Sequence, residues 1–128
     1  MWDGPFYMFY VPYHLPHLET PITVARAVLF GDAAIAPIGA PVCEVLTMAK
    51  RNLAAGEVLD GIGGFTCYGV LENMEVSMRD NLLPMGLSEG CRLKKDVSKD
   101  QPLSYDDVEL PPGRLCDKLR DEQNRYFS

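Results

Sequence analysis

A chain of 128 residues is long enough for one compact domain, and a hydrophobic share of 47% is ordinary for a folded protein, which excludes global disorder. The net charge of −6 argues against a nucleic-acid partner, because proteins that bind the phosphate backbone concentrate Lys and Arg on one face. Lys94, Lys95 and Lys99 do cluster, but Asp96 and Asp100 stand among them and offset their charge.

The chain begins with MWDGPFYMFYVPYHL, which has neither the basic start nor the uninterrupted apolar run of a signal peptide. No apolar run approaches the ~20 residues that a membrane span needs. The four cysteines (Cys43, Cys67, Cys91 and Cys116) form no Cys-x-x-Cys pair, so zinc-site spacing is absent. We therefore expect a cytoplasmic protein with no metal site and with four reduced, mostly buried cysteines.

Aromatic residues gather at the start of the chain. Six of the twelve lie within the first thirteen positions: Trp2, Phe6, Tyr7, Phe9, Tyr10 and Tyr13. Large exposed apolar patches normally mark interfaces, so this arm is expected to dock on another surface.

A helix is predicted next, with Thr20 as its cap, Pro21 at its first position and Gly31 as a left-handed stop. Its apolar residues recur at helical spacing and Arg26 is its only charge, so we expect it to be buried. The segment from Asp32 to Pro41 is rich in Ala, Gly and Pro and is typical of a connector.

Charge is distributed unevenly. Of the chain's 12 basic and 18 acidic residues, residues 1–49 hold only Asp3, Glu19, Arg26, Asp32 and Glu44. The sequence therefore changes near Lys50 from an interior-like segment to an independently solvated module.

That module contains two similar segments, Ala49–Asp60 (AKRNLAAGEVLD) and Leu93–Ser104 (LKKDVSKDQPLS), which lie 44 residues apart. Six positions match: Lys50 with Lys94, Arg51 with Lys95, Asn52 with Asp96, Leu53 with Val97, Glu57 with Gln101 and Leu59 with Leu103. The β-prone run CEVLTM leads into the first segment, and each segment contains a turn, so the pair predicts a pseudo-symmetric β module.

Three further elements are predicted along the chain. A short helix is expected near Glu75–Asp80, and Pro84 bars a central strand from the apolar segment 82–87. After Pro111-Pro112 a final helix is expected to pack on the β module. Its predicted inner residues are Leu115, Leu119, Glu122 or Gln123, and Tyr126; its predicted outer residues are Arg114, Lys118, Asp121 and Arg125.

His14, His17 and Glu19 form the one cluster with the residue types of a metal or acid–base site. Pro16 is expected to prevent a regular helix that presents both imidazoles on one face, and the spacing matches no zinc signature. Each His can be a hydrogen-bonded loop residue or can line an active site.

Gly61, Gly63 and Gly64 suggest a phosphate loop, but the dinucleotide fingerprint needs a glycine where Thr66 stands, which favours a simple turn. The alternative is a ligand site in which Lys50, Lys94 and this loop bind a sugar acid or a sugar phosphate. Paired acids such as Asp106-Asp107 are more typical of a surface or a helix cap.

The repeat segments, each with a basic start, a turn at Gly56-Glu57 or Asp100-Gln101 and a following Leu, resemble the SAF domain, a β-clip module. The fold class expected is therefore mainly β with helices (α+β). SAF domains occur in sialic acid synthases and altronate dehydratases and resemble type III antifreeze proteins.

A longer resemblance is carried by AKRNLAAGEVLDGIGG, by the stretch from Asn81 to Gln123, and by GPFYMFYVPYHLPHLETPITVARAVLF. These segments resemble the C-terminal end of homoserine-dehydrogenase-like NAD(P)-dependent oxidoreductases, some of which are reductoisomerase-like enzymes that act on deoxyxylulose phosphate. The resemblance implies residues 1–41 as the tail of a central lobe, 42–110 as the SAF-like domain and 111–128 as a C-terminal helix.

The Rossmann domain of those enzymes has no counterpart in this sequence. The resemblance therefore implies a fragment or split subunit that holds no cofactor and is not catalytic alone, whereas the whole enzyme uses NAD(P). It also implies that the partner is the N-terminal Rossmann and catalytic portion, within a homo-oligomer, and that His14 and His17 approach the active site.

Overall fold

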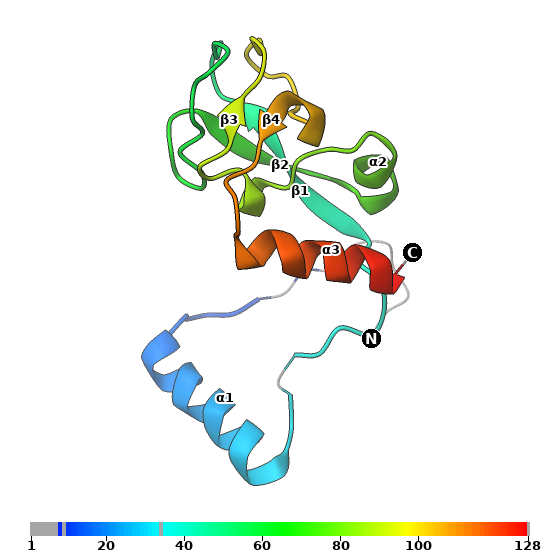
Figure 1. The fold of residues 1–128 in the computed structure, drawn as a ribbon. Helices are drawn as coiled ribbons and strands as arrows, with labels where there is room; N and C mark the ends of the chain where they lie inside the picture. Colours follow the sequence, from blue (N-terminus) through cyan, green and yellow to red (C-terminus); the bar gives the residue numbers. More distant parts are fainter. Residues whose placement is uncertain (1–7, 9, 34, 128) are drawn as a thin grey trace. The chain divides into compact units, whose positions relative to one another are not determined.

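The computed structural model describes residues 8, 10–33 and 35–127. The chain forms two compact units, of which the first ends at Ile38 and the second begins at Gly39. The first unit contains the helix α1 (Pro16–Phe30), and the second contains every strand that the structure describes (Figure 1). Helical residues outnumber strand residues and all strand pairs are antiparallel, so the described chain is α+β rather than mainly β.

Helix α1 begins five residues before the predicted start. Pro16 stands in its first turn, where the missing N–H of proline costs no hydrogen bond. Because the helix begins there, Thr20 and Pro21 lie inside it, and Thr20 is not its cap. The predicted stop is confirmed: Gly31 has φ of 60° and its N–H donates to the carbonyl of Ala27.

The prediction that α1 is buried is wrong for the described structure. None of its residues is buried, and Val28 and Leu29 are 77% and 71% exposed. The first unit holds a single helix with its flanking segments, which cannot cover an apolar surface on all sides. Tyr10 and Tyr13 of the aromatic arm are likewise exposed, and the predictions for Trp2, Phe6, Tyr7 and Phe9 lie outside the described residues.

The second unit is built on the hairpin of β1 (Cys43–Ala49) and β2 (Cys67–Asn73), in which Thr47 lies opposite Gly69. Strand β1 is the predicted β-prone run, whereas β2 was not predicted. The short helix α2 (Met74–Arg79) follows β2 directly and confirms the helix expected near Glu75–Asp80.

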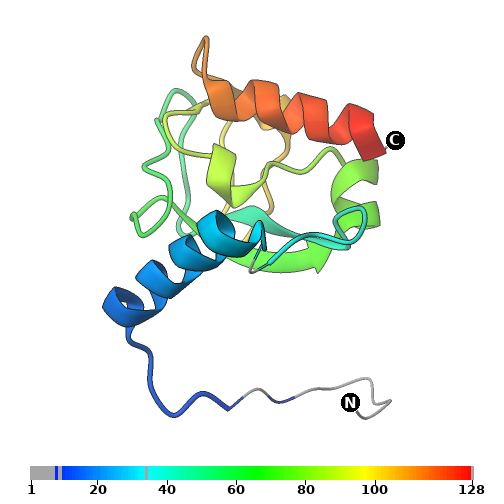
Figure 2. The ribbon, with the colours of Figure 1, turned by 90° about the horizontal axis from the view of Figure 1, so that it is seen from below.

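Short elements complete this unit. The 3₁₀ turn η1 (Met85–Leu87) occupies the apolar segment after Pro84, which makes an isolated bridge to Leu46 of β1. Strand β3 (Arg92–Leu93) pairs antiparallel with β4 (Val108–Glu109), and η2 (Tyr105–Asp107) precedes β4. Figures 1 and 2 show η1 between the hairpin and the last helix, α3 (Leu115–Phe127).

The two repeat segments pair with each other about a pseudo-two-fold axis. At its centre the N–H of Leu53 donates to the carbonyl of Val97, and the N–H of Val97 donates to the carbonyl of Leu53, both at 2.9 Å. Leu53 and Val97 hold matched positions of the two segments. A two-fold rotation exchanges the two residues and so converts each of these hydrogen bonds into the other, which places the axis between them.

Bonds away from the centre also occur in matched pairs. Ala49 N–H donates to the Gln101 carbonyl at 3.0 Å, and the matched Leu93 N–H donates to the Glu57 carbonyl at 2.9 Å. The predicted repeat is confirmed as a structural repeat.

Side chains and turns obey the same symmetry. The Asn52 side chain accepts the N–H of Lys99 at 2.9 Å, and the Asp96 side chain accepts the N–H of Ala55 at 2.8 Å. Both turns require a left-handed residue: Gly56 has φ of 86° and its counterpart Asp100 has φ of 62°. Asp is one of the few residues with a side chain that tolerate this conformation.

Matched positions of the repeat supply most of the hydrophobic core. Ala49, Leu53 and Leu59 from the first segment and Leu93, Val97 and Leu103 from the second are all buried. Leu83, Leu87, Cys91 and Val108 complete the cluster. All four cysteines are free, but only Cys67 and Cys91 are buried, so the expectation of mostly buried cysteines is wrong for Cys43 and Cys116.

The predicted orientation of α3 is wrong. Arg114, just before the helix, is half-buried, binds Asp117 at 2.7 Å and donates to the carbonyls of Leu87 and Glu89 at 3.0 and 2.7 Å. Leu115 is 68% exposed instead. The reason is that the neighbouring surface presents carbonyl groups that need donors, and a buried polar group without a partner is costly.

A core substitution tests the symmetric packing. We expect Leu53→Ala to lower the free energy of unfolding by roughly 2–5 kcal/mol, because Leu53 is only 3% exposed and a cavity would remain at the centre of the repeat. The matched control Leu71→Ala, at a residue 68% exposed in β2, should cost less than about 1 kcal/mol. Urea unfolding of both variants measures the difference, and equal losses would contradict the packing described.

Candidate functional site

A depression of about 540 Å³ lies on one face of the hairpin. Gly69 of β2 is one of its lining residues, and a Cβ atom there would come within 2.7 Å of Val45 Cγ1, so a larger residue would displace Val45. The walls of the depression come from the hairpin, from the loop that follows Asp60 and from η1. The lining residues are Val45, Lys50, Ile62, Gly63, Gly64, Cys67, Tyr68, Gly69, Met85 and Gly86.

Asp60 organises the loop on one side of the depression. Its carboxylate accepts the N–H of Phe65 at 2.6 Å, the N–H of Thr66 at 3.0 Å and the Thr66 hydroxyl. These bonds favour the ionised carboxylate and lower the pKa of Asp60 to about 2. Gly64 is required here because a Cβ atom would overlap the Asp60 carboxylate.

Lys50 closes the same loop from the other side. Its Nζ donates to the carbonyl of Gly64 at 3.0 Å and lies 5.9 Å from the centre of the Phe65 ring. Phe65 and Ile62 are 81% and 77% exposed, so the loop presents two large apolar side chains to solvent. Among the lining residues of the depression, Lys50 supplies a cation, Tyr68 and Cys67 supply a hydroxyl and a thiol, and the others are apolar or glycine.

The sequence-predicted ligand residues are only partly together. Lys50, Gly63 and Gly64 line the depression, whereas Gly61 and Lys94 do not. Gly61 starts the loop, with φ of 76° and with Glu89 Cβ only 2.8 Å from the place of a Cβ atom. The N–H of Lys94 donates to the carbonyl of Asp107, on the other half of the pseudo-symmetric unit.

The loop geometry favours a structural turn over a phosphate site. A phosphate nest needs free backbone N–H groups, but those of Phe65 and Thr66 already bind the Asp60 carboxylate. That carboxylate also places a negative charge where the phosphate would lie. Asp107 is structural as well: burial opposes its ionisation, but bonds from Lys95 and Ser104 outweigh burial and lower its pKa.

His14 and His17 lie in the first unit. Pro16 begins α1, so His17 stands in the first turn of the helix and His14 precedes it. His14 Nδ1 lies 3.3 Å from Glu19 Oε2, and the His14 side chain is 80% exposed. The described part of the chain contains no cluster of three potential metal ligands.

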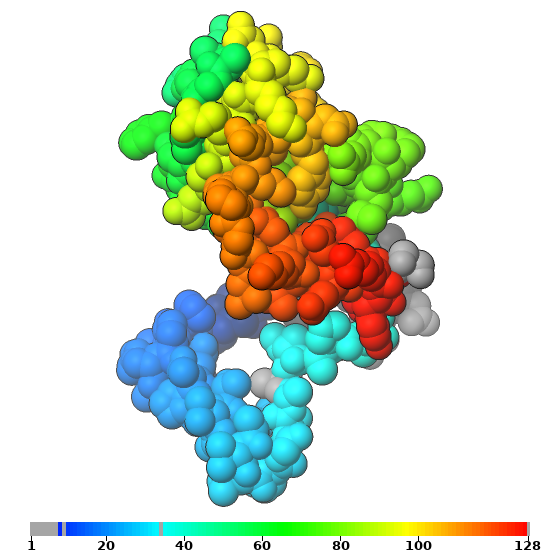
Figure 3. All heavy atoms as spheres, viewed as in Figure 1, coloured from blue at the N-terminus to red at the C-terminus, as the bar shows by residue number. Residues whose placement is uncertain are grey.

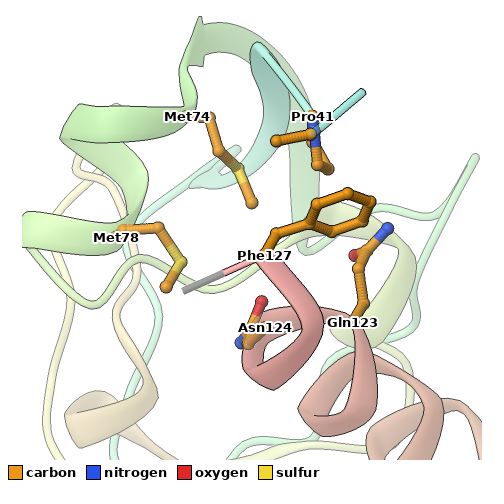
Figure 4. A pocket seen from close by; sticks show the side chains of 7 residues that line it. Pro41, Met74, Met78, Gln123, Asn124 and Phe127 are labelled. Carbon is orange, nitrogen blue, oxygen red and sulfur yellow. The ribbon is translucent and has the colours of Figure 1, made fainter. Parts of the chain in front are cut away.

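A smaller cavity of about 130 Å³ lies between α2 and the end of α3 (Figure 4). Met74 and Met78 of α2 face Phe127 of α3 across it, and Pro41 closes one side. The Asn124 side-chain oxygen is buried there without a hydrogen-bond partner in the described part of the chain. This cavity suits a small apolar group that carries one donor.

The sequence reasoning missed several residues that shape these sites. Asp60 is not among the residues singled out from the sequence, although an Asp before a glycine-rich turn is a known signal for side-chain capping of that turn. The half-buried ion pair between Glu44 of β1 and Arg120 of α3, at 2.6 Å, joins residues 76 positions apart and has no local sequence signal.

No family model matches this chain, and no curated protein matches it. Among the described residues, no helix combines the length and the apolar character needed to span a membrane.

Acid titration tests the role of Asp60. Its pKa of about 2 lies below the ordinary 3.8, so its contribution to stability is complete above pH 3.8 and is lost as pH falls through 2. NMR titration of the carboxyl carbon should give a midpoint near 2. The stability difference between wild type and Asp60→Asn should shrink over that acidic range.

The control for this titration is Asp106→Asn, at an exposed acid outside the loop, which should leave the Phe65 and Thr66 amides protected. An Asp60 midpoint at or above 3.8 would refute the loop structure described.

Proposed function

We propose that residues 42–110 form a SAF-like β-clip domain and that the chain serves as the C-terminal region of a homoserine-dehydrogenase-like NAD(P)-dependent oxidoreductase. Its role is structural: it completes the substrate lobe and contributes to oligomer contacts in the cytoplasm. Hydride transfer requires the Rossmann and catalytic portion, which binds NAD(P).

The observation that carries this proposal is the reciprocal pairing of Leu53 with Val97. The resemblance to SAF domains rests on the same two segments, and a β-clip module requires its repeated units to wind about a common axis. Matched turns at Gly56 and Asp100 support the same assignment.

A non-catalytic role is supported by how the second unit uses its charged side chains. Asp60 holds a loop, Asp107 binds Lys95 at 2.6 Å, and Glu44 binds Arg120. The lowered pKa values of Asp60 and Asp107 could mark catalytic groups, but hydrogen bonds and ion pairs that hold a fold lower pKa values too. Each of these acids already has a structural partner.

The first unit supports a role in binding the catalytic portion. Its helix exposes Ile22, Val28 and Leu29, and Arg26 is bound to Asp32 within the unit. Exposed apolar surface of this kind is typical of a segment that packs against another protein surface. In this proposal His14 and His17 then line the edge of the substrate site.

Complementation tests the proposal. The chain is mixed with the Rossmann and catalytic portion of a homoserine-dehydrogenase-like oxidoreductase that ends before its own SAF-like region. We expect a stable complex on size-exclusion chromatography, and NADPH oxidation on semialdehydes or phosphorylated sugars that neither component shows alone.

Val28→Asp should abolish both effects, because it places a charge on the apolar surface of α1. The matched control Thr23→Asp adds the same charge to the same helix and should retain them. The absence of both association and rescued activity would reject the proposed function.

A further inference from the structure

Helix α3 is amphipathic, but it packs on the second unit through its polar side. The half-buried positions are Arg114, just before the helix, and Asp117, Arg120 and Asn124 within it. At about 100° per residue, these positions lie on one side of the helix. They carry the Arg114–Asp117 and Arg120–Glu44 ion pairs.

The more exposed side of α3 carries an apolar stripe of Leu115, Leu119 and Tyr126, and Leu119 at the edge of this stripe also lines a depression with Pro84 and Leu87. The Leu115, Leu119 and Tyr126 side chains are 68%, 53% and 81% exposed. Figure 3 shows α3 at the surface of the second unit, with an outward side that no other part of this unit covers. An amphipathic helix normally turns its apolar side towards a protein interior, so the reversed orientation points to a partner on the stripe.

We propose that the apolar stripe is the interface of a homodimer in which α3 packs antiparallel against α3 of a second copy. With the two-fold axis between Arg120 and Asp121, Leu115 lies level with Tyr126 of the partner subunit, and the same contact recurs at the other end. The Leu119 side chains of the two copies lie on opposite sides of the axis, and together they fill the centre of the interface.

Charge complementarity favours a second copy as the occupant. Lys118 and Glu122 lie on one flank of the stripe, and the other flank has the uncharged Cys116 and Gln123. In the antiparallel pair, like flanks face each other, so Lys118 comes within about one residue, ~1.5 Å along the axis, of Glu122 of the partner subunit. The two-fold axis makes this ion pair twice.

The parallel alternative lacks this match. It places the charged flank of one helix against the uncharged flank of the other, so that neither Lys118 nor Glu122 gains an opposite charge. The salt bridges found in the described part of the chain involve neither residue. Both side chains can therefore serve an interface.

The expected dimer is weak. Thirteen helical residues span about 20 Å, so the contact is smaller than the roughly 800 Å² per partner of a standard interface. Contacts of this size are typical of weak or transient association, so we expect dissociation in the micromolar range. The inference rests on the oligomerisation role in the proposed function, but it needs only α3 and self-association.

Sedimentation velocity of the full chain tests the inference, from about 10 µM to about 500 µM. Wild type should dimerise, and Leu119→Glu should stay monomeric. Lys118→Glu and Glu122→Lys should each weaken dimerisation about tenfold or more, since like charges then face each other. The double variant Lys118→Glu/Glu122→Lys should recover the wild-type affinity.

The deciding sample is an equimolar mixture of the two single variants. One copy then offers two acids and the other two bases, so a heterodimer should form where neither variant dimerises well alone. Asp121→Lys, a charge change of the same size off the stripe, is the control and should dimerise normally. Far-UV circular dichroism confirms that each variant is folded.

The inference would be overturned if the wild-type chain stayed monomeric at every concentration tested. It would also be overturned if the dimer formed equally well in Leu119→Glu and in the charge variants. These outcomes are separate from complementation, whose readout is NADPH oxidation. A failed dimer with rescued activity rejects only this interface.

Discussion

The second unit depends on one reciprocal contact, the two hydrogen bonds that join Leu53 and Val97. Because these residues hold matched positions, the contact fixes the register of both repeat segments at once. Neighbouring bonds, from Ala49 to Gln101 and from Leu93 to Glu57, then follow on either side. The buried leucines of each segment meet in one core as a result.

The distinctive surfaces lie where this symmetry ends. After Leu59 the first segment continues into the loop that Asp60 holds, whereas after Leu103 the second continues into η2, where Ser104 and Asp107 bind each other. In the described structure, the loop that lines the depression beside Lys50 therefore has no counterpart after Leu103. The scaffold is symmetric, and the chemistry that it presents is not.

The sequence predicted what depends on local pattern. The repeat could be found because its matched residues all serve one core, and Gly31, α2 and the existence of α3 follow from capping and periodicity. The β2 strand was missed because Gly69 and Glu72 weaken its pattern, and its partner β1 ends 18 residues before it begins. The start of α1 was missed because Pro21 is equally suited to a first turn.

The orientation of α3 could not be predicted, because it depends on partners that are distant in sequence. Periodicity places Leu115, Leu119 and Tyr126 on one side, and an apolar side is normally the buried one. Here the polar side is buried instead, because Arg114 donates to the carbonyls of Leu87 and Glu89. Arg120 forms an ion pair with the carboxylate of Glu44. The apolar side and the polar side of α3 compete for burial, and the partners that decide the outcome come together only in the folded chain.

Native-state hydrogen exchange at two amides tests the central claim most directly. If Leu53 and Val97 bond reciprocally at the centre of the fold, both N–H groups should exchange only through global unfolding, with the same free energy as urea unfolding. Protection of one amide without the other, or rapid exchange of both in the folded protein, would contradict the pseudo-two-fold pairing.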